Sequence, residues 1–316
     1  MTVPMHLLSI DDLTPAQIVD VLDRADALKS ARKAAMDAGT SPVRDVLAGR
    51  TVALIFEKPS TRTRVSFQVA VAELGGHPLP LSAVELQLGR GETIADTAAV
   101  LSRYVHAIVI RTFGQARIEE LAVASSVSVV NALTDLEHPC QALADLQTFR
   151  EIHGGFAGRT LAYVGDGNNV AHSLLLAGAK VGLDIRMAHP SGFGPASEIV
   201  ARARSIAETS GAKIVVTSDP EEAVRGADAV YADVWASMGQ EDEADERART
   251  FAPYRITADL FALAAPDAVF LHCLPAHRGE EVTADVMDGA ASRVFDQAEN
   301  RLHAQKALLA LLLGED

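Results

Sequence analysis

Cysteine is scarce in this sequence, since only Cys140 and Cys273 occur among 316 residues. They form no CxxC pair and their separation fits no disulfide framework, which excludes a small scaffold held together by disulfides. A chain that does not use disulfides is suited to a reducing compartment. We therefore expect a cytoplasmic protein.

Long apolar runs and a basic leader are also missing. The longest uniformly apolar run, residues 307–313, is far shorter than the roughly 20 residues that cross a bilayer. Residues 1–14 contain no Lys or Arg but do contain Asp11 and Asp12, the opposite of a basic secretory leader. We expect neither a transmembrane span nor secretion.

Positive charge is in the minority, with 28 Lys and Arg against 42 Asp and Glu, for a net charge of −14. A field of this sign repels polyphosphate chains and anionic membranes. Proteins that bind such surfaces usually carry a basic patch or an excess of basic residues. We therefore expect no nucleic-acid partner and no membrane partner.

What the sequence does contain is an alternation of short β-rich runs with helix-like stretches. A length of 316 residues favours two domains over one core. Strands that are apolar on both faces and separated by helices are typical of parallel sheets covered on both sides. The predicted fold class is therefore α/β. The predicted strands are residues 51–56, 107–110, 160–164, 185–188, 214–217, 229–231 and 269–272.

Helix signals predict where the two domains meet. Thr14 and Pro15 open a helix that runs to about residue 35. Residues 141–153 are helical in pattern and end at Gly154 and Gly155, after which a new βαβ series begins. We predict domains at 1–148 and 149–298, with the apolar helix 299–316 docking back on the first. Each is expected to be a mainly parallel sheet flanked by helices, with the active site in the cleft between them.

An anion site is predicted directly after the first strand. Residues 57–64 read Glu-Lys-Pro-Ser-Thr-Arg-Thr-Arg and lead into a helix that continues through Leu74. Free amides and the dipole at a helix N-terminus favour an anion, and Arg adds bidentate contacts. The alternative is an N-cap box with solvated arginines. Two arginines in a first helical turn oppose the dipole, which favours the anion site.

Two short strings carry a resemblance to a known family. Ser60-Thr61-Arg62-Thr63-Arg64 resembles the carbamoyl phosphate signature of the aspartate and ornithine carbamoyltransferases. His138-Pro139-Cys140-Gln141 resembles their second signature, and Arg111 lies between the two strings at a strand end. Either string alone could arise by chance, whereas both in this order indicate the family. The resemblance spans nearly the whole chain.

The resemblance implies one set of residues for carbamoyl phosphate. Ser60, Thr61, Arg62 and Thr63 would hold the phosphate, while Arg111 and His138 would point at the carbonyl oxygen and Gln141 at the carbamoyl NH2. A donor positioned at that oxygen is worth roughly 3 kcal/mol when an amine turns it into an oxyanion. The full implied set is Ser60, Thr61, Arg62, Thr63, Gln87, Arg111, His138, Pro139, Cys140, Gln141, Cys273, Leu274 and Arg301.

The second half of the chain resembles the ornithine-specific members. Residues 233–239, Asp-Val-Trp-Ala-Ser-Met-Gly, and residues 272–275, His-Cys-Leu-Pro, look like ornithine-type signatures and lack the Lys or Arg that aspartate requires. The resemblance implies contacts from Asn169 and Met238 to the α-carboxylate, and from Asp233 and Ser237 to the α-ammonium. The carbonyls of Cys273 and Leu274 would face the δ-amine. Putrescine, an acylated ornithine and aspartate remain alternative acceptors.

The implied reaction yields L-citrulline and phosphate, in arginine synthesis or in arginine breakdown. Arg111, His138, Asp233 and Cys273 would be the catalytic residues, and neither a cofactor nor a metal is expected. Cys273 is equally compatible with proton transfer and with a plain structural role at a strand end. In the family, the loop that holds Gln87 reaches a neighbouring subunit, so a homotrimer or a multiple of trimers is expected.

Three other functions are weaker. Gly165-x-Gly167 after a strand suggests a nicotinamide-dependent dehydrogenase, but Val170 holds the third glycine position and the next strand ends without an acid for a ribose. A metal site at His272, Cys273 and His277 lacks a fourth ligand in a supporting spacing. An inactive regulator or scaffold would be expected to lack one of the Arg or His positions, and all are present.

Overall fold

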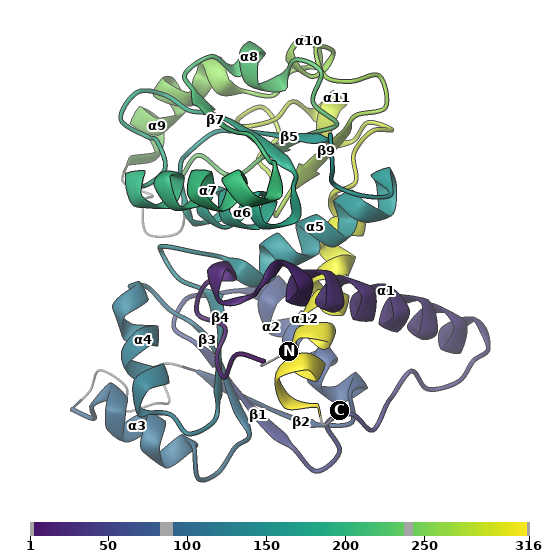
Figure 1. Ribbon diagram of the computed structural model, residues 1–316, viewed down its shortest axis with the longest axis vertical. Helices are drawn as coiled ribbons and strands as arrows, with labels where there is room; N and C mark the ends of the chain where they lie inside the picture. The colour runs from purple at the N-terminus through teal and green to yellow at the C-terminus, as the bar shows by residue number, and fades with distance from the viewer. Residues whose placement is uncertain (1–2, 83–90, 237–242, 315–316) are drawn as a thin grey trace. The chain divides into compact units, whose positions relative to one another are not determined.

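The computed structural model describes residues 3–82, 91–236 and 243–314 (Figure 1). The chain divides into two compact units, which we call unit 1 (residues 1–147 and 299–316) and unit 2 (residues 148–298). Two helices, α5 (Pro139–His153) and α12 (Val294–Leu313), each contribute residues to both units. Within the described ranges, no helix is both long and apolar enough to span a membrane.

Unit 1 is built around a parallel sheet with the strand order β2-β1-β3-β4. Its first long helix runs from Pro15 to Asp37, and Thr14 caps it in a capping box with Gln17. In chain order its elements are η1 (Ile10–Asp12), α1 (Pro15–Asp37), β1 (Thr51–Phe56), α2 (Thr61–Glu73), β2 (His77–Ser82), α3 (Ile94–Leu101), β3 (Ala107–Arg111), α4 (Gln115–Ala124) and β4 (Ser128–Leu133).

The two edge strands of this sheet were not among the predicted strands. β2 contains Pro78 and Pro80, which cannot donate to a neighbouring strand, and among the described residues its one strand partner is β1. β4 carries Ser128 and Asn131, which interrupt its apolar pattern. Leu7 pairs with Val130 and so continues the sheet beyond β4. The edge position of β2 tolerates its prolines because one side of that strand needs no strand partner, and Asn131 in β4 is satisfied by its Nδ2 bond to Leu8 O at 2.8 Å.

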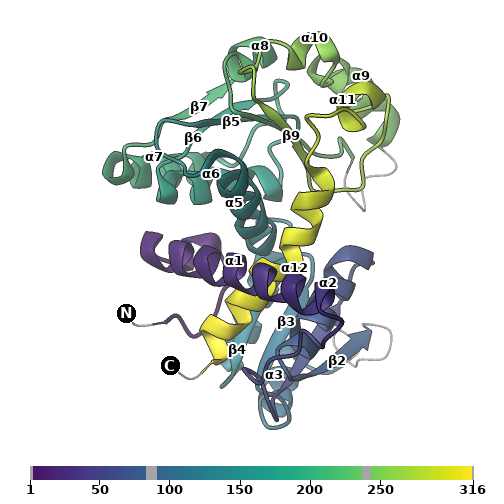
Figure 2. The ribbon, with the colours of Figure 1, turned by 90° about the vertical axis from the view of Figure 1, so that its right-hand side faces the viewer.

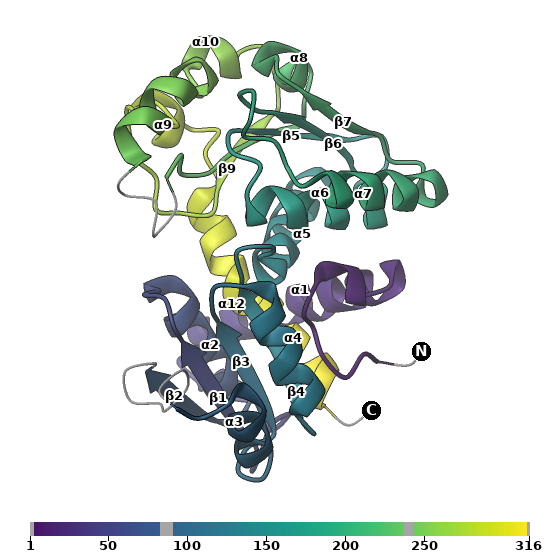
Figure 3. The same ribbon diagram turned by 90° about the vertical axis from the view of Figure 1, so that its left-hand side faces the viewer.

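Helices cover both faces of the unit 1 sheet. Ala53 and Ile55 of β1 and Ile108 of β3 pack with Ile118 of α4 and Ala98 of α3 in one buried cluster. Figures 2 and 3 show α12 on the face of the sheet opposite α3 and α4. The strands are apolar on both sides for this reason.

A buried charge cluster ties α12 to the rest of unit 1. Lys306 Nζ lies 2.8 Å from Glu73 Oε2, and Arg32 Nε lies 2.8 Å from Glu73 Oε1. Burial raises the pKa of Glu73, but hydrogen bonds from Lys306 and Arg32 outweigh it and lower the pKa overall. Lys29 Nζ adds a bond of 2.8 Å to Asn300 Oδ1. Three helices distant in sequence, α1, α2 and α12, therefore share one polar contact region.

Unit 2 contains a parallel sheet with the strand order β7-β6-β5-β8-β9. All seven strands predicted for the chain occur, with ends that differ by at most one residue. The elements of unit 2 are β5 (Thr160–Val164), α6 (Asn169–Val181), β6 (Asp184–Ala188), α7 (Ser197–Ser210), β7 (Ile214–Thr217), α8 (Pro220–Val224), β8 (Ala229–Ala232), α9 (Ala244–Phe251), η3 (Ala252–Tyr254), α10 (Ala258–Phe261), β9 (Val269–His272) and α11 (Ala284–Met287).

The unit 2 sheet is covered by α6 and α7 on one face and by α8 and α10 on the other (Figures 1 and 2). Val164 of β5, Val230 of β8 and Phe270 of β9 pack with Val224 of α8 and Leu260 of α10. Each sheet reverses its strand order once, between β1 and β3 in unit 1 and between β5 and β8 in unit 2. In open parallel sheets, ligands bind beyond the carboxyl ends of the strands at such reversals.

Candidate active site

The reversal in unit 1 lies beside the predicted anion site. Phe56, the last residue of β1, pairs with Arg111, the last residue of β3. Glu57 N donates to Arg111 O at 2.9 Å, so the two strands leave the sheet side by side. Residues 57–60 then lead into α2. This geometry brings the Ser-Thr-Arg-Thr string and Arg111 to one edge of the sheet.

The start of α2 has the features of an anion site. Ser60 is the N-cap, yet its side chain makes no capping hydrogen bond, so its hydroxyl does not serve the helix. Thr61 is the first helical residue, Arg62 is half-buried and Thr63 is buried. The N-cap box considered as the alternative is absent, which favours an external ligand for the hydroxyl and the first amides.

Arg301 of α12 reaches the same region. Its Nη1 donates to Gln141 Oε1 at 2.7 Å, and its Nη2 donates to Thr63 Oγ1 at 2.5 Å. The side chain is buried with 4% exposure. Gln141 Nε2 in turn donates to Asp145 Oδ1 at 2.7 Å. One guanidinium thus connects the first signature string to the second.

His138 lies in the same cluster and is held neutral. Burial lowers its pKa well below the ordinary value, and the positive charges of Arg301 and Arg111 lower it further. Pro139 begins α5, where a missing backbone N–H is harmless. Cys140 is buried, its Sγ lies 3.4 Å from Asn131 O, and burial raises its pKa to about 12. The Cys140 thiol is therefore a packing group, whereas the His138 ring can act as a neutral hydrogen-bonding group.

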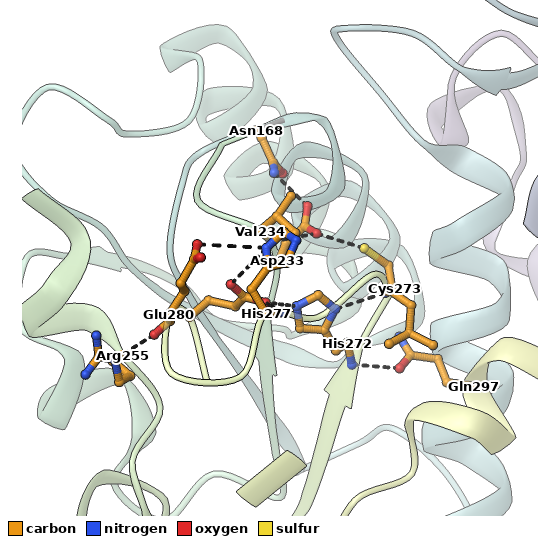
Figure 4. Close-up of polar contacts among 11 residues, drawn as sticks. Asn168, Asp233, Val234, Arg255, His272, Cys273, His277, Glu280 and Gln297 are labelled. Atoms are coloured by element: carbon orange, nitrogen blue, oxygen red, sulfur yellow. Dashed lines mark hydrogen bonds and ion pairs between the residues drawn. The ribbon is translucent and has the colours of Figure 1, made fainter. Parts of the chain in front are cut away.

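The second cluster lies at the strand reversal of unit 2 and centres on Asp233. Asp233 follows β8 and has 6% exposure. Its Oδ2 accepts from Asn168 Nδ2 at 2.8 Å (Figure 4). Its Oδ1 accepts from the backbone N–H of Val234 at 2.8 Å and from Cys273 Sγ at 2.9 Å. The carboxylate is thus held in place by neutral donors.

Asn168 is a site residue that the sequence prediction missed, because only its neighbour Asn169 was selected. Asn168 Oδ1 caps α6 by accepting from Val170 N and Ala171 N, while its Nδ2 binds Asp233. Tyr163 Oη also donates to Asn168 Oδ1, at 3.3 Å. Asn169 is the first helical residue of α6. An Asn directly before a predicted helix is an N-cap signal that could have identified it.

His272 fixes the conformation of the segment that holds Cys273 and Leu274. Leu274 N donates to His272 Nδ1 at 2.9 Å, so the proton of a neutral ring resides on Nε2. Nε2 lies 3.2 Å from Oε1 of the fully buried Glu281. Leu274 has a φ of 61° and precedes a cis peptide bond to Pro275. Glu281 was not predicted, because a single Glu carries no distinguishing sequence signal.

Arg247 of α9 is a third missed residue. Its side chain, with 5% exposure, forms an ion pair with Asp166 and donates to the carbonyl of Trp235. Burial raises the pKa of Asp166, and Arg247 opposes that shift. The guanidinium also lies over the ring of Phe193, 5.0 Å from its centroid. Arg247 therefore connects the loop after β5 to the segment that follows Asp233.

The glycine pair after β5 does not form a dinucleotide site. A Cβ on Gly167 would lie 2.1 Å from Pro195 N and 2.2 Å from Gly194 C. The backbone that contacts Gly167 is thus the protein's own, in the place where a pyrophosphate would approach. This explains the Gly165-x-Gly167 pattern without a nicotinamide cofactor.

Three of the predicted residues cannot be placed. Gln87, Ser237 and Met238 lie outside the described residues. All the other predicted positions are described, and they fall into the two clusters above. Unit 1 holds the first cluster, which consists of Ser60, Thr61, Arg62, Thr63, Arg111, His138, Pro139, Cys140, Gln141 and Arg301. Unit 2 holds the second, which consists of Asn169, Asp233, Cys273 and Leu274.

Comparison with known families decides what these clusters belong to. Residues 5–151 match the carbamoyl-P binding domain, and residues 157–312 the Asp/Orn binding domain, of the aspartate/ornithine carbamoyltransferases. The chain belongs to this family. A carbamoyltransferase from Parafrankia sp., named ornithine carbamoyltransferase, is 59% identical over 310 residues, which cover 98% of this chain and 96% of that protein. One of the same name from Methanothermobacter thermautotrophicus is 56% identical over 311 residues, covering 98% and 99%.

Solved carbamoyltransferase structures have the same fold. Ornithine carbamoyltransferase from Pyrococcus furiosus superposes with a TM-score of 0.92 at 52% identity and covers 98% of this chain and 96% of its own. Ornithine carbamoyltransferase from Gloeobacter violaceus superposes with a TM-score of 0.87 at 49% identity and covers 99% of this chain and 100% of its own. The α/β fold with two parallel sheets, predicted from the sequence, is confirmed by these relatives and by the strand pairings.

Proposed function

We propose that this carbamoyltransferase transfers the carbamoyl group of carbamoyl phosphate to the δ-amine of L-ornithine, giving L-citrulline and phosphate. The observation that carries the proposal is the Arg301 bridge, which joins Thr63 of one signature to Gln141 of the other at 2.5 and 2.7 Å. Arg111 and His138 lie in the same electrostatic cluster. Such a group of donors suits a small anion that carries both a phosphate and a carbonyl group.

The carbamoyl phosphate contacts follow from this cluster. Arg62 and the α2 N-terminus bind the phosphate together with the Ser60, Thr61 and Thr63 hydroxyls. Arg111 and neutral His138 donate to the carbonyl oxygen, where negative charge develops when the amine attacks. Gln141 accepts from the carbamoyl NH2. Arg301 orders Thr63 and Gln141 and adds positive charge, and the segment from Cys273 to Leu274 completes the contacts. Phosphate is a good leaving group, so no covalent intermediate is needed.

The ornithine contacts are assigned to unit 2. Asp233, held by Asn168 and Cys273, binds the α-ammonium together with Ser237. Asn169 and the backbone of Met238 bind the α-carboxylate. The δ-amine faces the carbonyls of Cys273 and Leu274, whose conformation depends on His272.

There is a physical reason for placing neutral groups beside the δ-amine. A lysine-like amine has a pKa near 10.4, so presenting it unprotonated at pH 7 costs roughly 4.6 kcal/mol. A carboxylate beside it would raise that cost by stabilising the ammonium. Asp233 therefore serves the end of ornithine that does not react. The bond from Cys273 Sγ to Asp233 Oδ1 gives the thiol a structural role.

A citrulline-forming assay with a panel of amines tests the proposal. Carbamoyl phosphate is supplied with L-ornithine, putrescine, N-acetylornithine or aspartate, and phosphate release is followed in parallel. We expect activity with ornithine at a kcat/KM at least about a hundredfold above that with the other amines. Higher activity with any of them would reassign the acceptor.

We further propose a homotrimer, or a multiple of trimers, in the cytoplasm, with Gln87 acting in a neighbouring subunit's site. Support comes from the family resemblance of residues 85–89 and, for the compartment, from two free cysteines. The word anabolic in the name of the Pyrococcus furiosus relative supports a role in arginine synthesis. Mixing the inactive variants Gln87→Ala and Arg62→Gln should restore part of the activity, because hybrid trimers contain intact sites. No restoration, or an active monomer, would contradict the trimer.

A further inference from the structure

The turn after Pro275 carries three metal-ligating side chains that the reaction does not use. They are His277, Glu280 and Glu281, and one ligand atom from each lies within 4.8 Å of the other two. His277 Nδ1 is 3.9 Å from Glu280 Oε2 and 3.8 Å from Glu281 Oε2. Figure 4 includes His277 and Glu280 with their polar contacts.

The backbone holds these three residues in a tight turn. Glu280 N donates to His277 O at 3.0 Å, and Gly279 N donates to Val282 O at 2.8 Å. Gly279 has a φ of 92°, a conformation that glycine adopts without a Cβ penalty. Ile256 N donates to Glu281 O at 2.9 Å and anchors the turn to the body of unit 2. The ligand set therefore has a fixed backbone scaffold.

Glu281 is the buried member of the set, and one of its oxygens lacks a donor. The side chain is 0% exposed. Its Oε1 accepts from His277 N at 2.5 Å and lies 3.2 Å from His272 Nε2. Its Oε2 is buried, has no hydrogen-bond partner among the described residues, and faces His277 Nδ1 at 3.8 Å. A buried carboxylate oxygen without a partner is costly, so this atom points to a missing ligand.

Neighbouring cations do not supply that ligand. Arg278 is bound to both carboxylate oxygens of Asp288, at 2.8 and 2.5 Å. Arg255 Nε donates to the backbone carbonyl of Glu280 at 2.7 Å. Among the residues that the structure describes, no Lys or Arg forms an ion pair with the carboxylate of Glu280 or of Glu281. The negative charge of the turn is thus available to a cation.

We propose that His277, Glu280 and Glu281 form a binding site for one divalent transition-metal ion such as Zn²⁺. One imidazole nitrogen and two carboxylate oxygens are ligands that Zn²⁺ takes at about 2.0–2.2 Å, and tetrahedral ligands at that range are about 3.4 Å apart. The separations of His277 Nδ1 from Glu280 Oε2 and from Glu281 Oε2, 3.9 and 3.8 Å, exceed that value by about half an ångström, which small side-chain rotations can close. The ion supplies the partner of Glu281 Oε2, and water fills the fourth position.

This site differs from the set of His272, Cys273 and His277 that the sequence suggested and then disfavoured. That set counted only His and Cys, whereas the present set keeps His277 and takes its other two ligands from the carboxylates of Glu280 and Glu281. Asp233, His272 and Cys273 form a separate cluster whose ligand atoms also lie within 4.8 Å of one another. The proposal does not depend on the reaction, but its test has to distinguish the two clusters.

Binding of Zn²⁺ to the full chain is measured by calorimetry in a Cys273→Ser background, which removes the thiol of the second cluster. We expect one site per chain. Adding His277→Ala or Glu280→Gln should weaken Zn²⁺ affinity by at least about tenfold. A loss of that size already follows when a residue that only supports a metal ligand is removed. His77→Ala is the matched control, because His77 is an exposed histidine on β2, and it should leave binding unchanged. Glu281→Gln is unsuitable, since it also disturbs the contacts of Oε1.

Co²⁺ absorption provides an independent readout in the unmodified chain. An ion at His277, Glu280 and Glu281 gives d–d bands without a thiolate-to-metal charge-transfer band, and His277→Ala removes those bands. The proposal is overturned if Cys273→Ser alone abolishes Zn²⁺ binding. It is equally overturned if His277→Ala and His77→Ala bind Zn²⁺ equally well.

Discussion

Units 1 and 2 present opposite charges at equivalent places. At the strand reversal of unit 1 the predicted site residues include the arginines Arg62, Arg111 and Arg301, and the charges of Arg111 and Arg301 help to keep His138 neutral. At the reversal of unit 2 the charged group among the predicted residues is Asp233, held by an amide and a thiol. The architecture is the same, so the charge of the ligand group each unit binds accounts for the difference. One unit suits a phosphate and the other an ammonium.

The units also differ in how their residues are brought together. Unit 2 is one continuous stretch of chain, whereas unit 1 needs α12 from the far end of the sequence. Arg301 and Lys306 both lie on α12, so one helix supplies a site contact and a buried structural contact. Substitutions can therefore separate folding from binding in unit 1.

The largest effect is expected for Glu73→Gln in unit 1. It leaves Lys306, with 1% exposure, buried without its charge partner, and such a break costs about 3–5 kcal/mol of unfolding free energy. Urea denaturation measures the loss. The control Asp37→Asn breaks the exposed pair with Lys33 and should cost less than about 1 kcal/mol. Equal losses in the two variants would show that the buried cluster does not hold α12.

Arg62→Gln should separate binding from folding in the same unit. Losing one charged donor at a reacting anion lowers kcat/KM for carbamoyl phosphate by about 10²–10³-fold. The melting temperature should change little, because Arg62 is only half-buried. Arg64→Gln, an exposed neighbour on α2, is the control and should keep near-normal kinetics. If Arg62→Gln binds carbamoyl phosphate normally or fails to fold, Arg62 is misassigned.

Asp233→Asn tests the role of the negatively charged group in unit 2. Losing a buried, charge-assisted contact costs on the order of a hundredfold in specificity. We expect kcat/KM for ornithine to fall far more than that for putrescine, which lacks the α-carboxylate and places its second ammonium differently. Asp259→Asn, at an exposed site in unit 2, should change neither value. A fall by the same factor for both amines would mean that Asp233 serves the δ-amine.

The smallest effect concerns the pH dependence of the stability of unit 1, through His303. Burial, helped by Lys306 and Lys29, lowers the pKa of His303 from 6.5 to about 4, against the opposing effect of Glu299. Below pH 6.5 the unfolded chain binds a proton that the folded chain does not bind until about pH 4, so stability falls as the pH drops through that range.

Between pH 7 and pH 5 this histidine should remove roughly 1–2 kcal/mol of unfolding free energy. Urea denaturation at the two pH values measures the loss. His303→Gln should show a loss smaller by that amount, whereas the control His77→Gln should behave like the unmodified chain. An unchanged loss in His303→Gln would refute the assignment.

In unit 1 the sequence predicted the interior strands and missed the edge strands, whereas in unit 2 it predicted all five strands of the described sheet, including the edge strands β7 and β9. The seven predicted strands are mostly apolar, which is the pattern of strands in parallel sheets covered by helices. Pro78 and Pro80 in β2 and Asn131 in β4 interrupt the apolar pattern and so conceal the edge strands of unit 1. Proline is tolerated in an edge strand, whereas an interior strand needs its backbone N–H groups for pairing. The last helix begins at Val294, five residues before the predicted start at 299.

The candidate site was predictable where chemistry is concentrated in a short string. Ser60 to Thr63 and His138 to Gln141 are of this kind, and their grouping around Arg301 appears in the structure. Asn168, Arg247 and Glu281 act through partners distant in sequence, namely Asp233, Asp166 and His272. Single polar residues of common types carry no such signal, so only the fold reveals them.

The position of α12 in the chain has a consequence for synthesis on the ribosome. Unit 2 is fully translated before residues 299–316 exist, so the unit that begins first is completed last. At about 5–20 residues per second, the end of residue 147 precedes that of α12 by on the order of 10–30 s. During that interval Glu73 has not yet met its partner Lys306, and helix α12 does not yet cover its face of the unit 1 sheet. A chaperone that binds nascent apolar surface would find its target on unit 1 during that interval.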